Sequence, residues 1–323
     1  MAVYTQLSAE SLRDLLAQYD VGELVSAKGI AEGVSNSNWF VEAAGSAAHG
    51  TRFILTMYER RIDIADLPFF LFLLDHLSAK GLPVPRTIHD REGDAWRMLD
   101  GKAVALIEFL TGISVDAPTP VQARNVGAVL ARMHIAARDY KGQRANDLDP
   151  ATSERVLRRC GRAALTQIDA DLPVALDEAS RIAAAWPDDL PQSVIHSDLF
   201  PDNVLMLGDE VGGLIDFYFA CNDAMAYDLA VTHAAWSFAD EGRTFRRDVG
   251  EALVEGYRSE RELSVAEFDA LPILAQGACM RFVSSRAQDW IDTPADALVT
   301  RKDPMDFMRR FDIYKTSGKA VFA

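Results

Sequence analysis

The sequence predicts an α+β protein with a small antiparallel sheet in an N-terminal lobe, residues 1–108, and a larger helical C-terminal lobe, residues 109–323. Short runs rich in β-branched and aromatic residues fill most of the first lobe, as strands require. Apolar residues recur at helical spacing from Thr119 onward. One strand–loop–strand insert, from Ser193 to Ala220, interrupts the helical lobe. These observations place most of the sheet in the first lobe and most of the helices in the second.

The N-terminal lobe opens with a helix and a hairpin. Ser8 is a helix-capping residue type placed before Leu12, Leu15 and Leu16, whose spacing predicts an amphipathic helix. The stretches NWFVEA and TRFILTMYE then flank the Gly- and Ala-containing stretch AGSAAHG. Two strand-like runs separated in this way predict a β-hairpin with a long loop.

A buried helix and a second strand pair complete this lobe. The apolar run LPFFLFLLDHLSAKG ends at Lys80 and Gly81, with Pro83 and Pro85 beyond it, which predicts a buried helix that stops there. The stretches DAWRML and KAVALIEFL predict two further strands. The lobe should therefore be a mostly antiparallel sheet with one helix packed on it.

The first predicted helix of the C-terminal lobe opens at Pro120, a residue type favoured in the first turn of a helix. Val126, Val129, Leu130 and Met133 follow at helical spacing. Further helices are predicted at 153–164, at 173–186 and in most of the chain after Asp228.

Composition restricts the possible partners. The chain of 323 residues carries a formal charge of −15 and has a pI near 4.8, whereas a nucleic-acid-binding surface needs clustered Lys and Arg. We therefore expect no nucleic-acid partner, and a cationic or zwitterionic small molecule suits the acidic balance. The cysteines Cys160, Cys221 and Cys279 are far apart, so neither a disulfide framework nor a zinc cluster is expected.

No membrane or export segment is expected. The first residues, MAVYTQLSAESLRDLLAQYD, lack a basic flank followed by an apolar core, and no apolar run approaches the ~20 residues that span a bilayer. We therefore expect a cytoplasmic protein without a membrane partner. The sequence does not specify an oligomeric state.

The insert in the helical lobe carries short polar side chains where strands normally bury apolar ones. The strand SVI leads to His196 and Asp198, and Asn203 and Asp216 flank the hairpin that follows. Carboxylate and amide oxygens are the ligands that Mg²⁺ prefers, which suits Asn203 and Asp216. Asp198 is then available to accept a proton from an attacking hydroxyl. The insert therefore predicts a site for phosphoryl transfer.

The spacing H-x-D-x-x-x-x-N, followed by an apolar strand that ends in I-D-F, resembles the catalytic and metal loops of the aminoglycoside phosphotransferase and choline kinase family. The stretches VGAVLARMH and YDLAVTHAAW are similar to helical landmarks of that family, so the resemblance covers most of the chain. It implies the two-lobed protein-kinase-like fold and the use of ATP with Mg²⁺. It also implies that Asp198 is the catalytic base, that His196 braces the loop, and that Asn203 and Asp216 bind the metal.

The resemblance implies a nucleotide site in the N-terminal lobe as well. The stretch GVSNSN stands at the position of the loop that covers the phosphates, where small side chains and backbone N–H groups can approach oxyanions. The stretch IEFL stands at the hinge, whose backbone pairs with adenine. The implied nucleotide-binding residues are Gly33, Ser35, Asn36, Ser37, Asn38, Glu108 and Leu110.

One position departs from the family pattern. The strand residue that is a phosphate-binding lysine in this fold falls at or near Thr56, in FILTMYE. Arg60 or Arg61, just downstream, can supply a positive charge instead, or the enzyme relies on Mg²⁺ alone.

The acceptor is implied by a narrower resemblance. The stretches GIAEGVSNSNWFV, FILTMYE, DFYFACNDAMAYDLA and RFVSSRAQDW, followed by KDPMDF, are most similar to the homoserine kinase branch, which phosphorylates the hydroxyl of L-homoserine in threonine biosynthesis. Arg281 or Arg286 suits the substrate carboxylate because a guanidinium can grip it with two hydrogen bonds. Asp289 suits the ammonium, and Asp202 can also face the acceptor.

Other interpretations fit parts of the same pattern. An isolated Asp at a strand end is usually a turn former or a helix cap, so only the joint arrangement favours catalysis. The candidate arginines of the late helix can equally form structural ion pairs. A kinase for another small alcohol or amine, such as an aminoglycoside or a choline-like acceptor, has the same motifs, and the missing lysine is compatible with a non-catalytic nucleotide-binding regulator. We further expect His134 to be a hydrogen-bonded core residue and Asp228 to brace the catalytic loop.

Overall fold

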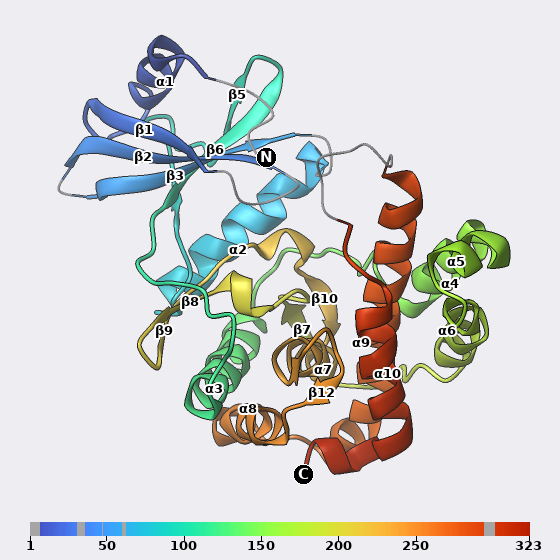
Figure 1. Ribbon diagram of the computed structural model, residues 1–323. Coiled ribbons are helices and arrows are strands. Elements are labelled where there is room, and N and C mark those ends of the chain that lie inside the picture. The colour runs from blue at the N-terminus through green and yellow to red at the C-terminus, as the bar shows by residue number, and fades with distance from the viewer. Residues whose placement is uncertain (1–6, 31–35, 47, 60–62, 294–300) are drawn as a thin grey trace. The chain divides into compact units, whose positions relative to one another are not determined.

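The computed structural model describes residues 7–30, 36–46, 48–59, 63–293 and 301–323 (Figure 1). The chain forms two compact units. The first unit comprises Met1–Gly112, Tyr140–Gly142 and Gly212–Tyr218, and the second comprises Ile113–Asp139, Gln143–Val211 and Phe219–Ala323.

An antiparallel sheet forms the framework of the first unit. Its order is β1-β2-β3-β6-β4, and β5 pairs with the first residues of β6, on the same edge that β4 occupies farther along the strand. The strands are β1 (Leu24–Ile30), β2 (Asn36–Ser46), β3 (Gly50–Tyr58), β4 (Thr87–Ile88), β5 (Arg97–Leu99) and β6 (Lys102–Glu108). The register places Thr56 between Asn38 of β2 and Ala105 of β6.

The two faces of this sheet are covered by different helices (Figure 1). On one face, α1 (Ala9–Leu16) packs its leucines against a cluster that includes Leu55 and Met57 of β3. On the other face, α2 (Leu67–Ala79) packs against a cluster that includes Tyr58 and Ala105. Alternate residues of a strand point to opposite faces, so the side chain of Thr56 lies on the α2 face.

Helices make up most of the second unit. They are α3 (Pro120–Ala137), α4 (Pro150–Cys160), α5 (Arg162–Ile168), α6 (Ala175–Ala184), α7 (Met225–Trp236), α8 (Arg247–Glu260), α9 (Val265–Asp292) and α10 (Met305–Ser317). The short strands β7 (Gln192–Ile195) and β10 (Cys221–Ala224) form one antiparallel pair, and β11 (Phe238–Ala239) and β12 (Thr244–Phe245) form another. The hairpin of β8 (Val204–Leu207) and β9 (Glu210–Leu214) follows the loop after β7.

Helix α7 is the centre of the second unit (Figure 1). Every one of its residues is buried, because α3, α8, α9 and β7 all pack against it. The long helix α9 also contacts α4, α6 and α10. Groups on α7 and α9 are therefore held rigidly, which matters for the site described below.

The helices α3 and α8 approach each other closely enough to bring their backbones into contact. A Cβ atom on Gly256 would lie 1.8 Å from the carbonyl oxygen of Arg124, and one on Gly127 would lie 2.1 Å from that of Leu253. Both distances are too short for any side-chain carbon, so this packing requires glycine at both positions.

The structure confirms the predicted elements and moves some boundaries. Ser8 caps α1, Thr119 caps α3, and the predicted hairpin and buried helix are β2–β3 and α2. The helix predicted at 153–164 begins earlier, where Asp149 accepts a hydrogen bond from the backbone of Thr152, and breaks at Gly161, whose φ is 78°. The helix predicted at 173–186 is shorter because a 3₁₀ turn (Leu172–Val174) precedes α6. Among the described residues, no helix combines the length and the apolar character needed to cross a bilayer.

Candidate active site

The loop that carries His196 and Asp198 is held at both ends by secondary structure. It leaves β7 directly after Ile195, which pairs with Cys221 of β10. It ends in a 3₁₀ turn, Pro201–Asn203, from which β8 begins. The side-chain amide of Asn203 donates a hydrogen bond of 2.7 Å to the backbone carbonyl of Asp198, which closes the loop on itself.

Asp228 of α7 braces this loop from beneath, as predicted. Its carboxylate is fully buried and accepts hydrogen bonds of 2.7 Å from the backbone N–H groups of both His196 and Ser197. The Nε2 atom of His134 lies 2.9 Å from the same carboxylate, and His134 Nδ1 lies 2.8 Å from the hydroxyl of Tyr257 on α8. His134 is therefore the hydrogen-bonded core residue that the sequence predicts.

The pKa of Asp228 reflects these contacts. Burial alone raises the pKa of a carboxyl group, but His134 and the loop N–H of His196 favour the charged form. They hold the pKa of Asp228 below its ordinary value. The brace is therefore a carboxylate that stays ionised in the interior.

Ser197 adopts a backbone conformation that L-residues rarely use, with φ of 60°. Its N–H donates to Asp228, its hydroxyl donates to the carbonyl oxygen of Phe219 at 2.8 Å, and its own carbonyl oxygen accepts from the Arg281 guanidinium. Three separate contacts thus hold a strained residue directly before Asp198, a pattern that is typical of functional sites.

The Asp198 side chain is largely buried, with 18% of its surface exposed. One carboxylate oxygen, Oδ1, lies 3.3 Å from a guanidinium nitrogen of Arg281 on α9. Burial raises the pKa of Asp198, and the positive charge of Arg281 opposes that effect only in part, so the pKa lies above its ordinary value. A carboxylate with a raised pKa is a stronger base, as a proton acceptor in catalysis requires.

Asn203 and Asp216 offer oxygen ligands, and each belongs to a different unit. The amide nitrogen of Asn203 is used within the loop, which leaves its Oδ1 atom pointing away from that hydrogen bond. Asp216 follows β9, has an exposed side chain and adopts a φ of 64°. Both donor types suit a hard divalent cation.

A neutral hydrogen-bonded cluster occupies the strand position where the fold family has a lysine. The Thr56 hydroxyl donates to the Asn38 side-chain oxygen at 2.9 Å and also hydrogen-bonds to Tyr218. The hydroxyls of Tyr218 and Tyr58 are 3.0 Å apart. Burial raises the pKa of Tyr218 to about 12, so this hydroxyl stays neutral. Tyr218 thereby ties the segment that carries Asp216 to the sheet.

Asn36 and Ser37 lie at the start of β2 and face opposite sides of the sheet. The Oδ1 atom of Asn36 is buried and has no hydrogen-bond partner within the described residues. Ser37 donates at 2.7 Å to Glu59, which also pairs with Lys102. Gly33 and Ser35, and the alternative cations Arg60 and Arg61, lie outside the residues that the structure describes.

Glu108 and Leu110, the predicted hinge residues, lie at and just beyond the end of β6. The Glu108 N–H donates to the carbonyl oxygen of Arg86 at 3.0 Å, and its carboxylate lies 3.5 Å from the Arg86 guanidinium. The Leu110 side chain is half-buried.

The acceptor candidates of α9 lie in different surroundings. Arg281 contacts the catalytic loop, as described above. Arg286 instead pairs with Asp306 at 2.8 Å and donates to the carbonyl oxygen of Asp303 at 2.9 Å. Asp289 is exposed. The structure thus brings Arg281 to Asp198 and engages Arg286 with the start of α10.

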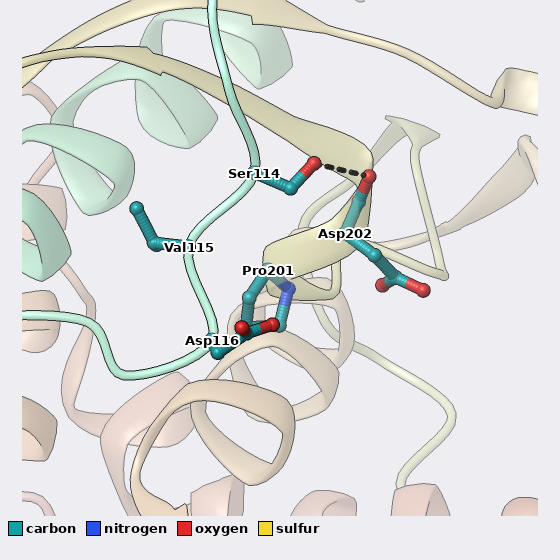
Figure 2. A pocket seen from close by; sticks show the side chains of 5 residues that line it. All are labelled: Ser114, Val115, Asp116, Pro201 and Asp202. Carbon is teal, nitrogen blue, oxygen red and sulfur yellow. Dashed lines mark hydrogen bonds between the residues drawn. The ribbon is translucent and has the colours of Figure 1, made fainter.

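Asp202 lies beside a cavity of about 260 Å³ (Figure 2). Its backbone carbonyl accepts a hydrogen bond of 3.1 Å from the Ser114 hydroxyl, so the segment before α3 is tied to the 3₁₀ turn of the loop. The cavity is lined by Ser114, Val115, Asp116, Pro201 and Asp202. Sequence reasoning missed Ser114 and Asp116 because they lie in a segment without a recognisable motif.

Comparison with known proteins identifies the family. The model of the phosphotransferase enzyme family matches residues 26–263. The chain belongs to this family. Relatives of similar length include the homoserine kinase of Methylobacterium radiotolerans, which is 45% identical over 99% of this chain and 98% of its own length. The homoserine kinase of Agrobacterium fabrum is 45% identical over 98% of this chain and 96% of its own length. The homoserine kinase of Gluconobacter oxydans is 46% identical over 98% of this chain and 99% of its own length. The predicted resemblance, including its homoserine kinase branch, is confirmed.

Solved structures of other phosphotransferases share the fold. An amicoumacin kinase in complex with AMP-PNP and Ca²⁺ matches with a TM-score of 0.71 at 15% identity, covering 98% of this chain and 96% of that one. A choline kinase from Cryptosporidium parvum matches with a TM-score of 0.64 at 13% identity, covering 97% of this chain and 96% of that one. The predicted protein-kinase-like fold, an antiparallel sheet followed by a helical C-terminal part, is thereby confirmed.

Proposed function

We propose that the protein transfers the γ-phosphoryl group of ATP to the side-chain hydroxyl of L-homoserine and forms O-phospho-L-homoserine, a step in threonine biosynthesis. The observation that supports this proposal is the braced loop, which holds the largely buried carboxylate of Asp198 five residues before the amide of Asn203. Relatives named homoserine kinase, 45% identical over nearly the whole chain, support the choice of acceptor.

Asp198 is the proposed catalytic base. The acceptor oxygen forms a bond to the γ-phosphorus while the bond from that phosphorus to the oxygen of ADP breaks, and the hydroxyl proton goes to Asp198. His196 contributes through the loop: its N–H donates to Asp228, and its Nδ1 atom lies 3.3 Å from the Asp198 N–H. Most of the rate enhancement then comes from positioning and charge neutralisation.

Asn203 and Asp216 are the proposed ligands of Mg²⁺. The remaining amide oxygen of Asn203 and the exposed carboxylate of Asp216 are the donor types that this ion prefers. When bound, the ion neutralises negative charge on the nucleotide phosphates.

The proposed nucleotide contacts come from the start of β2 and the end of β6. The side-chain NH₂ groups of Asn36 and Asn38 are the proposed neutral donors to the phosphates, while the Asn38 oxygen accepts from Thr56. Because Thr56 replaces the lysine, hydrogen bonds rather than a fixed cation serve the phosphates here. Gly33, Ser35 and Ser37 belong to the same proposal, and the backbone of 108–110 is proposed to pair with adenine.

For the acceptor, we propose that Asp202 receives the ammonium, because its carboxylate lies on the catalytic loop beside an open cavity. Arg286 and Asp289 stay predictions for the remaining contacts of the substrate.

A panel of acceptors tests the proposed substrate. Initial rates with Mg-ATP should give a kcat/KM for L-homoserine at least ~100-fold above those for choline, an aminoglycoside and 3-aminopropan-1-ol, which lacks the carboxylate. The Asp198→Asn variant, assayed in parallel, controls for contaminating kinases. A higher kcat/KM for any of the other acceptors would overturn the homoserine assignment while leaving phosphotransferase activity intact.

A further inference from the structure

Arg281 reaches the Asp198 carboxylate from outside the catalytic loop. It projects from the middle of α9 and is 4% exposed. One guanidinium nitrogen donates to the backbone carbonyl of Ser197, and the other lies 3.3 Å from Oδ1 of Asp198. The same guanidinium also hydrogen-bonds to Tyr227 of α7.

Aromatic rings and hydrogen-bond acceptors already contact this guanidinium. Its central carbon lies 4.7 Å from the ring centroid of Phe282 and 5.4 Å from that of Phe219. A substrate carboxylate needs two parallel N–H donors in one plane at an accessible edge. Arg281 is buried beside two aromatic rings and donates to the loop, so its geometry does not match carboxylate capture.

The arrangement leaves the two oxygens of Asp198 in different states. Oδ1 contacts Arg281, whereas no hydrogen bond from the described part of the chain reaches Oδ2. When one oxygen of a carboxylate is held, the group cannot rotate freely about its χ2 bond. The position of the other oxygen, here Oδ2, is then also restricted.

We propose that Arg281 is a positioning residue that fixes the Asp198 carboxylate through Oδ1 and the strained Ser197 carbonyl, so that Oδ2 is the oxygen that takes the acceptor proton. This inference rests on the proposed role of Asp198 as the base. It assigns Arg281 to the base instead of to the substrate carboxylate that the sequence suggested. Rigid helix α9 thereby sets the direction of the base.

Kinetics of the Arg281→Gln and Arg281→Lys variants test the proposal. Arg281→Gln should lower kcat by about 10- to 100-fold and change the KM for the acceptor less than about 3-fold, since the loss is in orientation and not in substrate binding. Arg281→Lys keeps the charge but loses the planar fork that reaches Ser197 and Asp198 at once, so it should recover part of kcat.

A double-mutant cycle identifies the partner through which Arg281 acts. Asp198→Asn alone should lower kcat by roughly 10²- to 10⁴-fold. In that background Arg281→Gln should have little further effect, because a residue that acts through Asp198 has nothing left to position. The preference for homoserine over 3-aminopropan-1-ol should also be unchanged in Arg281→Gln, because both acceptors use the same base.

Arg310→Gln is the matched control for loss of a buried arginine. Arg310 is 8% exposed and pairs with Asp306 and the carbonyl oxygen of Ala234, away from the catalytic loop. It should lower thermal stability, measured by calorimetry, with kcat within about 3-fold of wild type.

Three outcomes would overturn the inference. A raised KM for homoserine with an unchanged kcat would make Arg281 a substrate ligand. Additive effects of Arg281→Gln and Asp198→Asn would show that Arg281 acts independently of Asp198. A near-normal kcat in Asp198→Asn would overturn both the base and its positioning residue, which distinguishes failure of the proposed function from failure of the inference alone.

Discussion

At the residue scale, Asp216 combines an exposed carboxylate with a backbone conformation that costs free energy. A non-glycine residue at φ of 64° is disfavoured by about 1–2 kcal/mol and persists only where neighbouring contacts maintain it. Two residues farther along, the Tyr218 hydroxyl meets both Thr56 and Tyr58. The cluster at the strand position of the missing lysine therefore also ties the segment of the proposed metal ligand to the sheet.

We predict that Asp216→Ala weakens ATP binding in the presence of Mg²⁺ by at least about tenfold, because one of two protein ligands of the ion is lost. Binding of ATP in EDTA should change by less than about twofold, as measured by isothermal titration calorimetry. Asp209→Ala, which removes another exposed acid of the same hairpin, is the control and should leave both affinities near wild type. Equal losses with and without Mg²⁺ would contradict metal ligation by Asp216.

At the element scale, the contact between α3 and α8 links core packing to the catalytic loop. Helix α3 carries His134 and α8 carries Tyr257, and both side chains belong to the hydrogen-bond chain that ends on Asp228. Gly256 and Gly127 allow the helices to approach until backbone meets backbone. The close approach of α3 and α8, which these two glycines allow, thus supports the orientation of Asp228 beneath the loop.

We predict that Gly256→Ala lowers the free energy of unfolding by about 1–3 kcal/mol. The added Cβ would lie 1.8 Å from the Arg124 carbonyl oxygen, so the helices must separate, and this cost exceeds the intrinsic gain in helix propensity from alanine. Urea denaturation followed by circular dichroism measures the change. Arg258→Ala, on the exposed side of α8, should change stability by less than about 0.5 kcal/mol. A Gly256→Ala protein as stable as wild type would rule out the close helix contact.

At the scale of the whole molecule, the C-terminal residues cover a buried histidine of α7. His233 is fully buried, its Nδ1 atom lies 2.6 Å from the Tyr314 hydroxyl, and its ring is 4.6 Å from that of Phe322. Gly250 of α8 leaves the space that the imidazole fills. Its Nε2 atom has no hydrogen-bond partner within the described residues.

We predict that this histidine makes the protein sensitive to mild acid. Burial lowers the pKa of His233 to about 3 in the folded protein. In the unfolded chain the same histidine has its ordinary pKa of about 6.5 and takes up a proton below that pH. The unfolded state therefore binds the extra proton, so the stability from neutral His233 is complete above pH 6.5 and is lost as the pH falls toward 3. This group alone lowers the free energy of unfolding by up to about 1.4 kcal/mol per pH unit in that range.

The comparison of wild type with His233→Gln isolates this contribution. Free energies of unfolding measured in urea at pH 7.5, 6.5, 5.5 and 4.5 should fall less steeply for the variant, because all other titrating groups are common to both proteins. The variant should be less stable than wild type at pH 7.5, where its packing defect dominates, and the difference should shrink at pH 4.5. Parallel curves would contradict the prediction, because they would mean that the pKa of His233 is the same in the folded and unfolded states.

The parts of the fold that depend on local signals were predictable from the chain. Helix caps at Ser8 and Thr119, the β2–β3 hairpin and the apolar helix α2 are set by neighbours within a few residues, and each forms as expected. The break at Gly161 was not predicted, because a glycine in a helical pattern becomes a break only when packing requires its positive φ.

The residues of the candidate site likewise include some that local sequence patterns predict and some that only the structure brings together. The order and spacing of His196, Asp198, Asn203 and Asp216 resemble one family closely, and the comparisons confirm that family. Asp228 was expected as a brace of the loop and His134 as a hydrogen-bonded core residue, and the structure confirms both.

Only the tertiary structure decided what Arg281 and Thr56 contact. Arg281 lies 83 positions along the chain from Asp198, and Tyr218 lies still farther from Thr56, so no local pattern could pair them. A side chain as long as arginine can serve a substrate, a surface pair or a buried base, and the choice depends on which elements pack around it. The sequence by itself determined the reaction class and pointed to the loop that we propose performs it. The packing of α7 and α9 against that loop determined how the Asp198 carboxylate is held, because burial and distance, not residue type, select the partner of each charge.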